Sequence, residues 1–107
     1  MKYEEFINLF ENHHKGHRHT ITRRELTMHT RLNDRDNRAY IEQAWRDGYF
    51  IINNNDGWGY FLVDFNDPAD VGMFVKYIAI EERRKRTIEE KLYIGYKQLG
   101  GVVSEGV

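Results

Sequence analysis

The segment from residue 34 to residue 48 combines arginines with the spacing of a helix. If Ile41 faces the core, positions 37, 44 and 45 face it too. One outward stripe then remains, formed by Arg35, Arg38, Glu42 and Arg46. An arginine guanidinium can donate two parallel hydrogen bonds to guanine O6 and N7, or it can clamp a phosphate. The spacing therefore predicts a surface suited to nucleic acid, and the alternative is an ordinary solvated face.

Asn37 lies on the inward side of this segment and leaves two interpretations open. Either Asn37 is buried with a hydrogen-bonding partner, or the helix is rotated by one position and the amide can pair with an adenine. Arg23 and Arg24, at the start of the preceding helix, are expected to assist on the DNA backbone. Arg18, in the loop before them, belongs to the same basic stretch.

A histidine-rich stretch precedes these arginines. Four histidines fall within seven residues: His13, His14, His17 and His19. Neutral imidazoles ligate zinc or nickel, but the chain has no cysteine and the cluster spans a helix end and a loop. We therefore expect no metal and no other cofactor, and a solvated loop is the simplest interpretation. A basic flank near phosphates, whose charge would rise as the pH falls, is the alternative.

Charge is segregated along the chain although the net charge is -1. Residues 15–46 hold eight Lys or Arg and four acids, whereas residues 47–75 hold five acids and no base. A polyanionic partner should therefore meet the first of these segments. The second, which is also aromatic, offers an alternative surface for a protein partner.

Several classes of function are not indicated by any motif. The 107 residues contain no cysteine nucleophile, no glycine-rich phosphate loop and no metal-hydrolase spacing, and a core of this size leaves little room for a substrate pocket. We therefore expect a protein that is not an enzyme. No run of 18 apolar residues occurs, and Lys2, Glu4 and Glu5 do not open a signal peptide. A cytoplasmic protein without membrane contact is predicted.

The elements that must position these side chains follow from periodicity and capping residues. A first helix, ending around residues 13–16, is predicted by an apolar face made of Tyr3, Phe6, Ile7 and Phe10. Thr22 and Glu25 form a capping box, which begins a second helix with Leu26 inward and either Met28 or His29 beside it.

A third helix and a hairpin are expected next. Asp34 is a good N-cap for a helix from Arg35 to Asp47, and Gly48 suits the left-handed position after it. Residues 49–52 and 58–63 are β-formers on either side of an Asn- and Gly-rich turn, which predicts a β-hairpin.

The last helix should begin at Asp67 and Pro68 and end at Leu99, where Gly100 and Gly101 stop it, a length of about 32 residues. Its first turns should pack on the domain through Val71, Phe74, Val75 and Ile78. In its charged middle, pairs are expected four residues apart, Glu81 with Lys85 and Glu82 with Arg86.

Farther along the same helix, Ile88, Leu92 and Leu99 lack partners in the domain. The expected cover is a second copy of the chain, as a short antiparallel or crossed helix pair. A monomer whose tail bends back onto the first helix is the alternative.

The order of helix, helix, turn, helix and hairpin is that of a winged helix-turn-helix domain. The segment from residue 21 to residue 63 resembles the winged-helix family that includes the N-terminal domain of biotin-operon repressors, and especially short phage and prophage proteins with a long C-terminal helix. The matching residues are Ile21-Thr22-Arg23-Arg24-Glu25-Leu26, Asp34-Arg35, Arg38, Ile41, Asp47-Gly48-Tyr49, Ile51, Ile52, Gly59-Tyr60 and Leu62, with Asp67, Val71, Phe74, Ile78 and Arg83 in the tail.

The resemblance implies an α+β fold with a winged-helix DNA-binding domain over residues 1–66 and a dimerising helix over residues 67–100. It also implies sequence-specific binding of double-stranded DNA by the third helix. Such a protein would act as a transcriptional regulator or as an accessory factor at a replication or packaging origin, in the host cytoplasm if it is phage-encoded.

The hairpin departs from the family pattern, because no base occurs between Arg46 and Lys76 and the wing cannot neutralise phosphates as most wings do. Its asparagine amides would have to replace them, or the wing does not touch DNA. Trp58 and Tyr60 either form a contact patch for protein or cover the hairpin's core face. The alternative function is a winged-helix module that binds or inhibits a host protein through residues 47–75.

Overall fold

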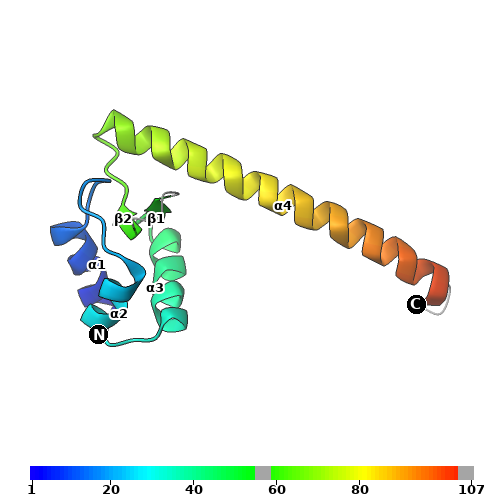
Figure 1. Ribbon diagram of the computed structural model, residues 1–107, viewed down its shortest axis with the longest axis horizontal. Helices are drawn as coiled ribbons and strands as arrows, with labels where there is room; N and C mark the ends of the chain where they lie inside the picture. The colour runs from blue at the N-terminus through cyan, green and yellow to red at the C-terminus, as the bar shows by residue number, and fades with distance from the viewer. Residues whose placement is uncertain (55–58, 104–107) are drawn as a thin grey trace. The chain divides into compact units, whose positions relative to one another are not determined.

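The computed structural model describes residues 1–54 and 59–103 and has an α+β fold (Figure 1). The elements follow the predicted order: α1 (Tyr3–His13), α2 (Arg23–Thr30), α3 (Asp34–Arg46), β1 (Ile51–Asn54), β2 (Gly59–Leu62) and α4 (Pro68–Val103). The chain divides into two compact units, Met1–Phe74 and Val75–Val107. The division falls inside α4, because the first turns of this helix pack with the first unit.

The core of the first unit lies between α1, α2, α3 and the hairpin. Phe6, Ile7 and Phe10 are buried as predicted, and Leu9 joins them. Tyr3 is half-buried, and its hydroxyl donates to the Asp47 carboxylate at 2.6 Å. Burial, together with this neighbouring carboxylate, raises the pKa of Tyr3 above its ordinary value. The contact ties the start of α1 to the end of α3.

The capping box at the start of α2 is confirmed. The Thr22 hydroxyl accepts from the Glu25 amide, and the Glu25 carboxylate accepts from the Thr22 amide, each at 3.1 Å. These hydrogen bonds lower the pKa of Glu25. The prediction that Met28 or His29 faces inward is wrong, since both are exposed. Thr30 is buried instead, because it lies four residues beyond the buried Leu26 on the same helix face.

The limits of α3 differ from the prediction by one residue. Asn33, not Asp34, is the N-cap, and its side-chain oxygen accepts from the Asp36 amide at 2.8 Å. Both residue types cap helices well, and with Asn33 in that role the Asp34 carboxylate is left to pair with arginines. At the other end Gly48 adopts a φ of 90°, which confirms the predicted left-handed position.

The predicted hairpin is confirmed, with strands shorter than expected. Ile51 lies opposite Leu62 and Ile52 opposite Phe61 in an antiparallel pair. On its other edge β2 pairs with the chain before α2, where Ile21 and Tyr60 exchange backbone hydrogen bonds of 2.9 and 2.7 Å. Sequence patterns did not predict this third segment. The predicted residues at 55–58, the turn tip and Trp58, lie outside the described residues.

Gly59 allows this close pairing. It has a φ of 110°, and a Cβ built on it would lie 2.2 Å from the Ile21 carbonyl oxygen. No other residue fits there without moving backbone.

The last helix begins where predicted, with the Asp67 carboxylate accepting from the Ala69 amide at 2.9 Å. It continues through both glycines to Val103, so the predicted stop at Gly100 is wrong. Glycine is unfavourable in a helix by about 1 kcal/mol relative to alanine, but it ends a helix only where the backbone turns left-handed.

The packing of the first turns of α4 is confirmed in part. Phe74 meets the rings of Trp45, Phe50 and Phe65 at centroid distances of 5.8, 5.2 and 5.4 Å. Val75, in contrast, is exposed, because it follows Phe74 by one position and points away from this cluster. Among the described residues, no helix has the length and apolar content needed to cross a membrane.

Candidate nucleic-acid interface

The inward face of α3 is held by contacts along its whole length. Asn37 and Ala44 are buried, and Tyr40 and Ile41 are half-buried against the core. Trp45 is half-buried and packs against the rings of Phe50 and Phe74. The Tyr40 hydroxyl donates to the Met1 carbonyl and the Trp45 indole N–H donates to the Ile51 carbonyl, both at 2.9 Å. These contacts with the residue at the chain start and with β1 help to set the rotation of α3 about its axis.

The outward face of α3 carries the predicted stripe. Arg35, Arg38, Glu42 and Arg46 are all exposed. A shallow depression on this face is lined by Asp34, Arg35, Arg38, Ala39 and Glu42. The small side chain of Ala39 leaves the helix backbone accessible between the longer side chains. The structure thus gathers three of the predicted residues around one hollow, and Arg46 follows on the same side one turn beyond Glu42.

Asn37 is buried with a hydrogen-bonding partner, in agreement with the first of the two interpretations of this residue. It is 2% exposed, and its side-chain oxygen accepts from the Thr30 hydroxyl at 2.9 Å, while the Leu32 amide donates to the same hydroxyl at 3.2 Å. The prediction that Asn37 could contact DNA is therefore wrong, because the side chain is used to join α2 to α3. Over the described residues, Asn37 Nδ2 has no hydrogen-bond partner.

Charge on the interface is partly compensated. The Asp34 carboxylate pairs with Arg38 at 2.9 Å and with Arg23 at 3.4 Å, and so it links the starts of α2 and α3. Over residues 1–54 and 59–103, no ion pair of Arg35 or Arg46 with a carboxylate is found. These two arginines therefore carry the uncompensated charge of the α3 face.

The other predicted contacts lie around this face. Arg24 is exposed at the start of α2, and Arg18 is exposed in the loop after α1. A polar hollow between α2 and the hairpin is lined by Arg23, Asn53, Gly59 and Tyr60. Asn53 is the described wing residue that could stand in for a basic side chain there.

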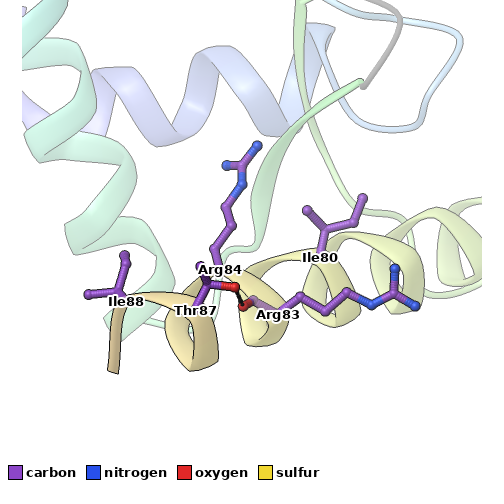
Figure 2. A pocket seen from close by; sticks show the side chains of 5 residues that line it. All are labelled: Ile80, Arg83, Arg84, Thr87 and Ile88. Atoms are coloured by element: carbon purple, nitrogen blue, oxygen red, sulfur yellow. Dashed lines mark hydrogen bonds between the residues drawn. The ribbon is translucent and has the colours of Figure 1, made fainter. Parts of the chain in front are cut away.

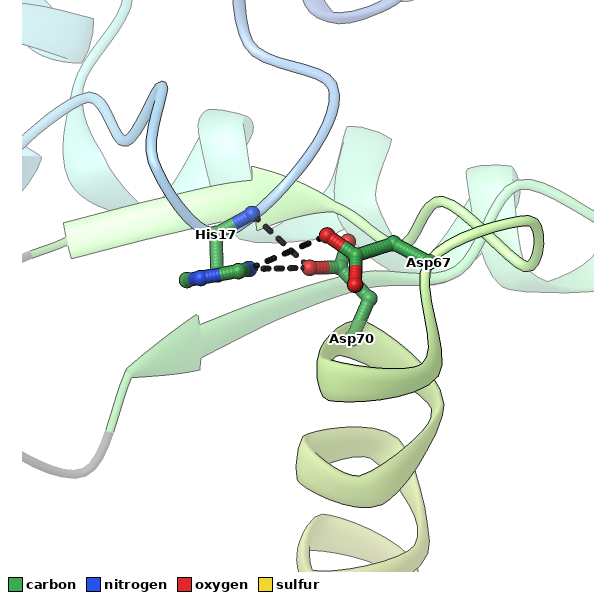
Figure 3. A group of neighbouring side chains, drawn as sticks. All are labelled: His17, Asp67 and Asp70. Atoms are coloured by element: carbon green, nitrogen blue, oxygen red, sulfur yellow. Dashed lines mark hydrogen bonds and ion pairs between the residues drawn. The ribbon is translucent and has the colours of Figure 1, made fainter.

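The histidines do not form a common cluster. His14 Nδ1 meets the His19 carbonyl at 2.8 Å, whereas His17 turns to the start of α4, as Figure 3 shows. His17 Nδ1 lies 2.5 Å from Asp70 Oδ1 and 3.7 Å from Asp67 Oδ2. Because a carboxylate only accepts, Nδ1 carries the proton of the short contact.

Asp70 is the fully buried acid of this group. It also accepts from the His17 amide at 3.1 Å and from the Asp64 amide at 2.8 Å. Burial by itself would raise the pKa of Asp70, but the hydrogen bonds from Asp64 and His17 outweigh it and lower the pKa. The carboxylate therefore anchors the loop and the strand end to the first turn of α4.

His17, Asp67 and Asp70 also have the composition of a metal site, with one ligand atom each within 4.8 Å of one another. However, the Asp70 oxygens already accept three hydrogen bonds. The donors present fit a hydrogen-bonded anchor better than a cation. No local sequence pattern indicates this anchor, because 53 residues separate His17 from Asp70.

The acidic segment 47–75 does not present a row of free carboxylates. Asp47 accepts from Tyr3, Asp64 accepts from the Asn66 amide at 3.0 Å, and Asp67 caps α4. Asp70 is buried, and Asp56 lies outside the described residues. Tyr60 packs against the core, in agreement with one of its two interpretations.

In the second unit the charged side chains pair along α4. Arg84 meets Glu81 at 3.1 Å and Lys85 meets Glu89 at 4.0 Å. The predicted pairs of Glu81 with Lys85 and of Glu82 with Arg86 are not among the ion pairs of the described residues, since Glu81 is taken by the nearer Arg84.

The first unit is thus an α+β domain in which a three-residue turn joins α2 to an arginine-bearing helix. Comparisons with protein-family models, with characterised proteins and with solved structures find no match. A proposal for its function therefore rests on the contacts and charges of the site.

Proposed function

We propose that this protein is a winged helix-turn-helix protein that binds double-stranded DNA through the exposed face of α3. The turn at residues 31–33 joins α2 to α3, and the hairpin follows α3 directly. In helix-turn-helix proteins the second helix of such a pair enters the major groove. Sequence-specific binding of this kind would serve a transcriptional regulator, or an accessory factor at a replication or packaging origin.

The observation that carries the proposal is the division of α3 into two faces. Its inward side chains are fixed by the core, whereas Arg35, Arg38 and Arg46 stand on the exposed side. Guanidinium groups in this position can donate to guanine edges, and Glu42 can accept from cytosine N4. Arg38 is already oriented by Asp34, which reduces the conformational entropy lost on binding.

The charge balance indicates how the binding energy would be divided. Residues 22–46 contain six arginines and four acids, so attraction to phosphates is modest. Affinity should then depend on base contacts more than on counterion release, and its decrease with salt should be shallow.

A second candidate function rests on Phe65. This side chain is half exposed although its ring touches Phe50 and Phe74 at 5.8 and 5.4 Å. An exposed aromatic side chain beside a packed cluster is typical of a protein contact. A module that binds a host protein would use this patch rather than α3.

The test is a fluorescence anisotropy series with a random duplex pool and with duplexes selected from it, at two salt concentrations. Replacing a base-reading arginine, Arg35→Ala, should cost about 1–3 kcal/mol on the selected duplex and relax the sequence preference. Replacing a phosphate contact, Arg24→Ala, should weaken all duplexes alike and reduce the salt slope by about one.

Lys85→Ala is the matched control, because it removes one exposed positive charge outside the first unit. It should leave binding to the selected duplex unchanged. Absence of binding to any duplex at low salt would contradict the proposal and leave the Phe65 patch as the better account.

A further inference from the structure

The part of α4 that lies in the second unit separates its positive charges from its negative charges. Between residues 76 and 91, one face of the helix is marked by residues spaced by three or four positions: Lys76, Ile80, Arg83, Arg84, Thr87 and Lys91. Four of these six residues are basic and none is acidic. The four basic side chains are all exposed. We call these four basic residues the α4 basic stripe.

The acids of the same segment lie elsewhere around the helix. At about 100° per residue, Glu82 and Glu89 fall on the side opposite the stripe, and Glu81 and Glu90 border it. Residues 76–91 contain six bases and four acids, an excess of only two positive charges. The helix nevertheless has one distinctly basic side, because the acids are kept off it.

Most of the charge on the stripe is free of ion pairs. Arg84 pairs with Glu81 at 3.1 Å, and the two side chains are 70% and 46% exposed. An exposed pair of this kind is weak, so Arg84 can leave Glu81 for a stronger anion. Over residues 1–54 and 59–103, no ion pair joins Lys76, Arg83 or Lys91 to a carboxylate. These three charges are therefore uncompensated.

A groove lies at the centre of the stripe. Its lining residues are Ile80, Arg83, Arg84, Thr87 and Ile88, and Figure 2 shows Arg84 projecting from the helix beside Ile80 and Ile88. Thr87 is short, and its hydroxyl donates to the Arg83 carbonyl at 3.0 Å. The two arginines therefore border a space that Thr87 leaves open to an anion.

We propose that the α4 basic stripe binds the phosphate backbone of double-stranded DNA without reading its sequence. The stripe extends about 22 Å from Lys76 to Lys91, at about 1.5 Å per residue. One strand of a duplex carries a phosphate per about 3.4 Å of its axis, so several phosphates face a helix over this length. The guanidinium groups of Arg83 and Arg84 can each donate two hydrogen bonds to one phosphate. The stripe belongs to the second unit and reads no bases, so its role is additional to that proposed for α3.

The positions of the apolar side chains favour a duplex over a lipid surface. A helix that lies in a membrane interface buries an apolar face, and its basic residues border that face. In α4 the exposed side chains of Leu92 and Leu99 lie on the side that also carries Glu81. Burial of this side would bring an acid to anionic headgroups, and contact through the stripe would leave both leucines in water.

The stripe predicts a measurable salt dependence. Each phosphate contact adds about 0.9 to the steepness with which log affinity falls against log salt concentration. The three uncompensated charges would therefore add about three to this slope if each meets a phosphate. The α3 face alone predicts only a shallow decrease, so the added slope belongs to the second unit.

The first test measures binding of the full chain to a random-sequence DNA duplex by fluorescence anisotropy, at salt concentrations from about 50 to 200 mM. Lys91→Ala should weaken binding several-fold at the lowest salt concentration and reduce the slope by about one. Lys85→Ala is the matched control, because it removes the same exposed charge from the opposite side of α4. It should leave the affinity and the slope unchanged. Alanine is a good helix former, so neither variant should disturb α4.

A pair of arginines repeats the comparison. Arg84 and Arg86 are both exposed and only two residues apart, but they lie on nearly opposite sides of the helix. Arg84→Ala should weaken binding to the random duplex several-fold, whereas Arg86→Ala should leave it unchanged.

The same measurements on a chain with Arg35→Ala and Arg38→Ala keep the stripe separate from recognition by α3. Loss of sequence preference in this chain, with the difference between Lys91→Ala and Lys85→Ala retained, would support both proposals. If no duplex is preferred by the unaltered protein and that difference still remains, the stripe is supported and recognition by α3 fails. Equal effects of Lys91→Ala and Lys85→Ala, with the sequence preference intact, would overturn the stripe alone.

Two other anions serve as competing probes at the same salt concentrations. Binding to phosphatidylserine vesicles, without binding to the random duplex, would assign the stripe to a membrane surface and overturn the proposal. Polyglutamate that displaces the duplex as effectively as DNA of equal charge would also overturn it, because the stripe would then not distinguish phosphates from carboxylates.

Discussion

The two units of the chain use charged and apolar side chains in opposite ways. In the first unit carboxylates are anchored by defined donors, as Asp70 is by His17 and Asp64, and the large apolar side chains are mostly buried. In the second unit the ion pairs run along one exposed helix surface and every side chain from residue 81 to residue 99 is exposed. The first unit is therefore held together by contacts between its elements, whereas residues 81–99 of the second unit are held by helical hydrogen bonds and exposed ion pairs within one helix.

The largest effect on the first unit is expected for Gly59→Ala. The new Cβ would meet the Ile21 carbonyl, and the residue would keep a left-handed φ, so the free energy of unfolding should fall by at least about 3 kcal/mol. Thermal and urea unfolding measure this change. Gly48→Ala is the control, because it has a left-handed φ of 90° but nothing within 4 Å of the new atom. If both variants lower the free energy of unfolding equally, the close approach of the Ile21 carbonyl is not the reason for a glycine at position 59.

Asp70→Asn should have the next largest effect, lowering the free energy of unfolding by about 2–3 kcal/mol. The buried carboxylate accepts three hydrogen bonds, and the asparagine NH₂ group would place a donor where these groups also donate. Asp67→Asn is the matched control, since asparagine also caps a helix. Its effect on urea unfolding should be smaller. Equal losses for the two variants would show that the charge near His17, and not the buried anchor, stabilises this corner.

Asp70 also predicts a pH dependence with a definite sign. Its pKa is lower in the folded than in the unfolded state, so its stabilisation is complete above the ordinary aspartate pKa of about 4 and is lost as the pH falls through the folded value. Urea unfolding between about pH 2 and pH 5 measures this loss. The slope should be shallower in Asp70→Asn, and an unchanged slope would assign the acid sensitivity to other groups.

A smaller loss, about 1–2 kcal/mol, is expected for Thr30→Val, which leaves the buried Asn37 side chain without its donor. Thr27→Val is the matched control on the same helix. Its hydroxyl donates to the Arg23 carbonyl, which keeps its helical partner when the hydroxyl is lost. A larger loss for the control would contradict the role of Asn37 in joining α2 to α3.

The smallest effect belongs to the second unit. Glu81→Gln should change the free energy of unfolding by less than about 0.5 kcal/mol, because its pair with Arg84 is exposed and three residues apart in one helix. A loss near that of Asp70→Asn would mean that an exposed ion pair of the second unit stabilises the chain as much as the buried carboxylate of the first unit.

Local patterns predicted the elements and much of the α3 face. The capping box at Thr22, the left-handed Gly48 and the outward stripe of arginines depend on residues within a few positions of one another, and such relations can be read along the chain. Where two residues suit one role equally, as Asn33 and Asp34 do at the N-cap, the pattern was off by one position.

Tertiary structure alone decided which distant groups meet. The pairing of Ile21 with Tyr60, the anchor of His17 on Asp70 and the burial of Asn37 against Thr30 depend on how the elements pack together. Polar side chains of this kind carry no periodic signal, since the same residue is stable in solvent or buried with a partner. Composition and spacing thus determined the helices, the hairpin and the exposed arginines, and packing determined which polar groups hold them in place.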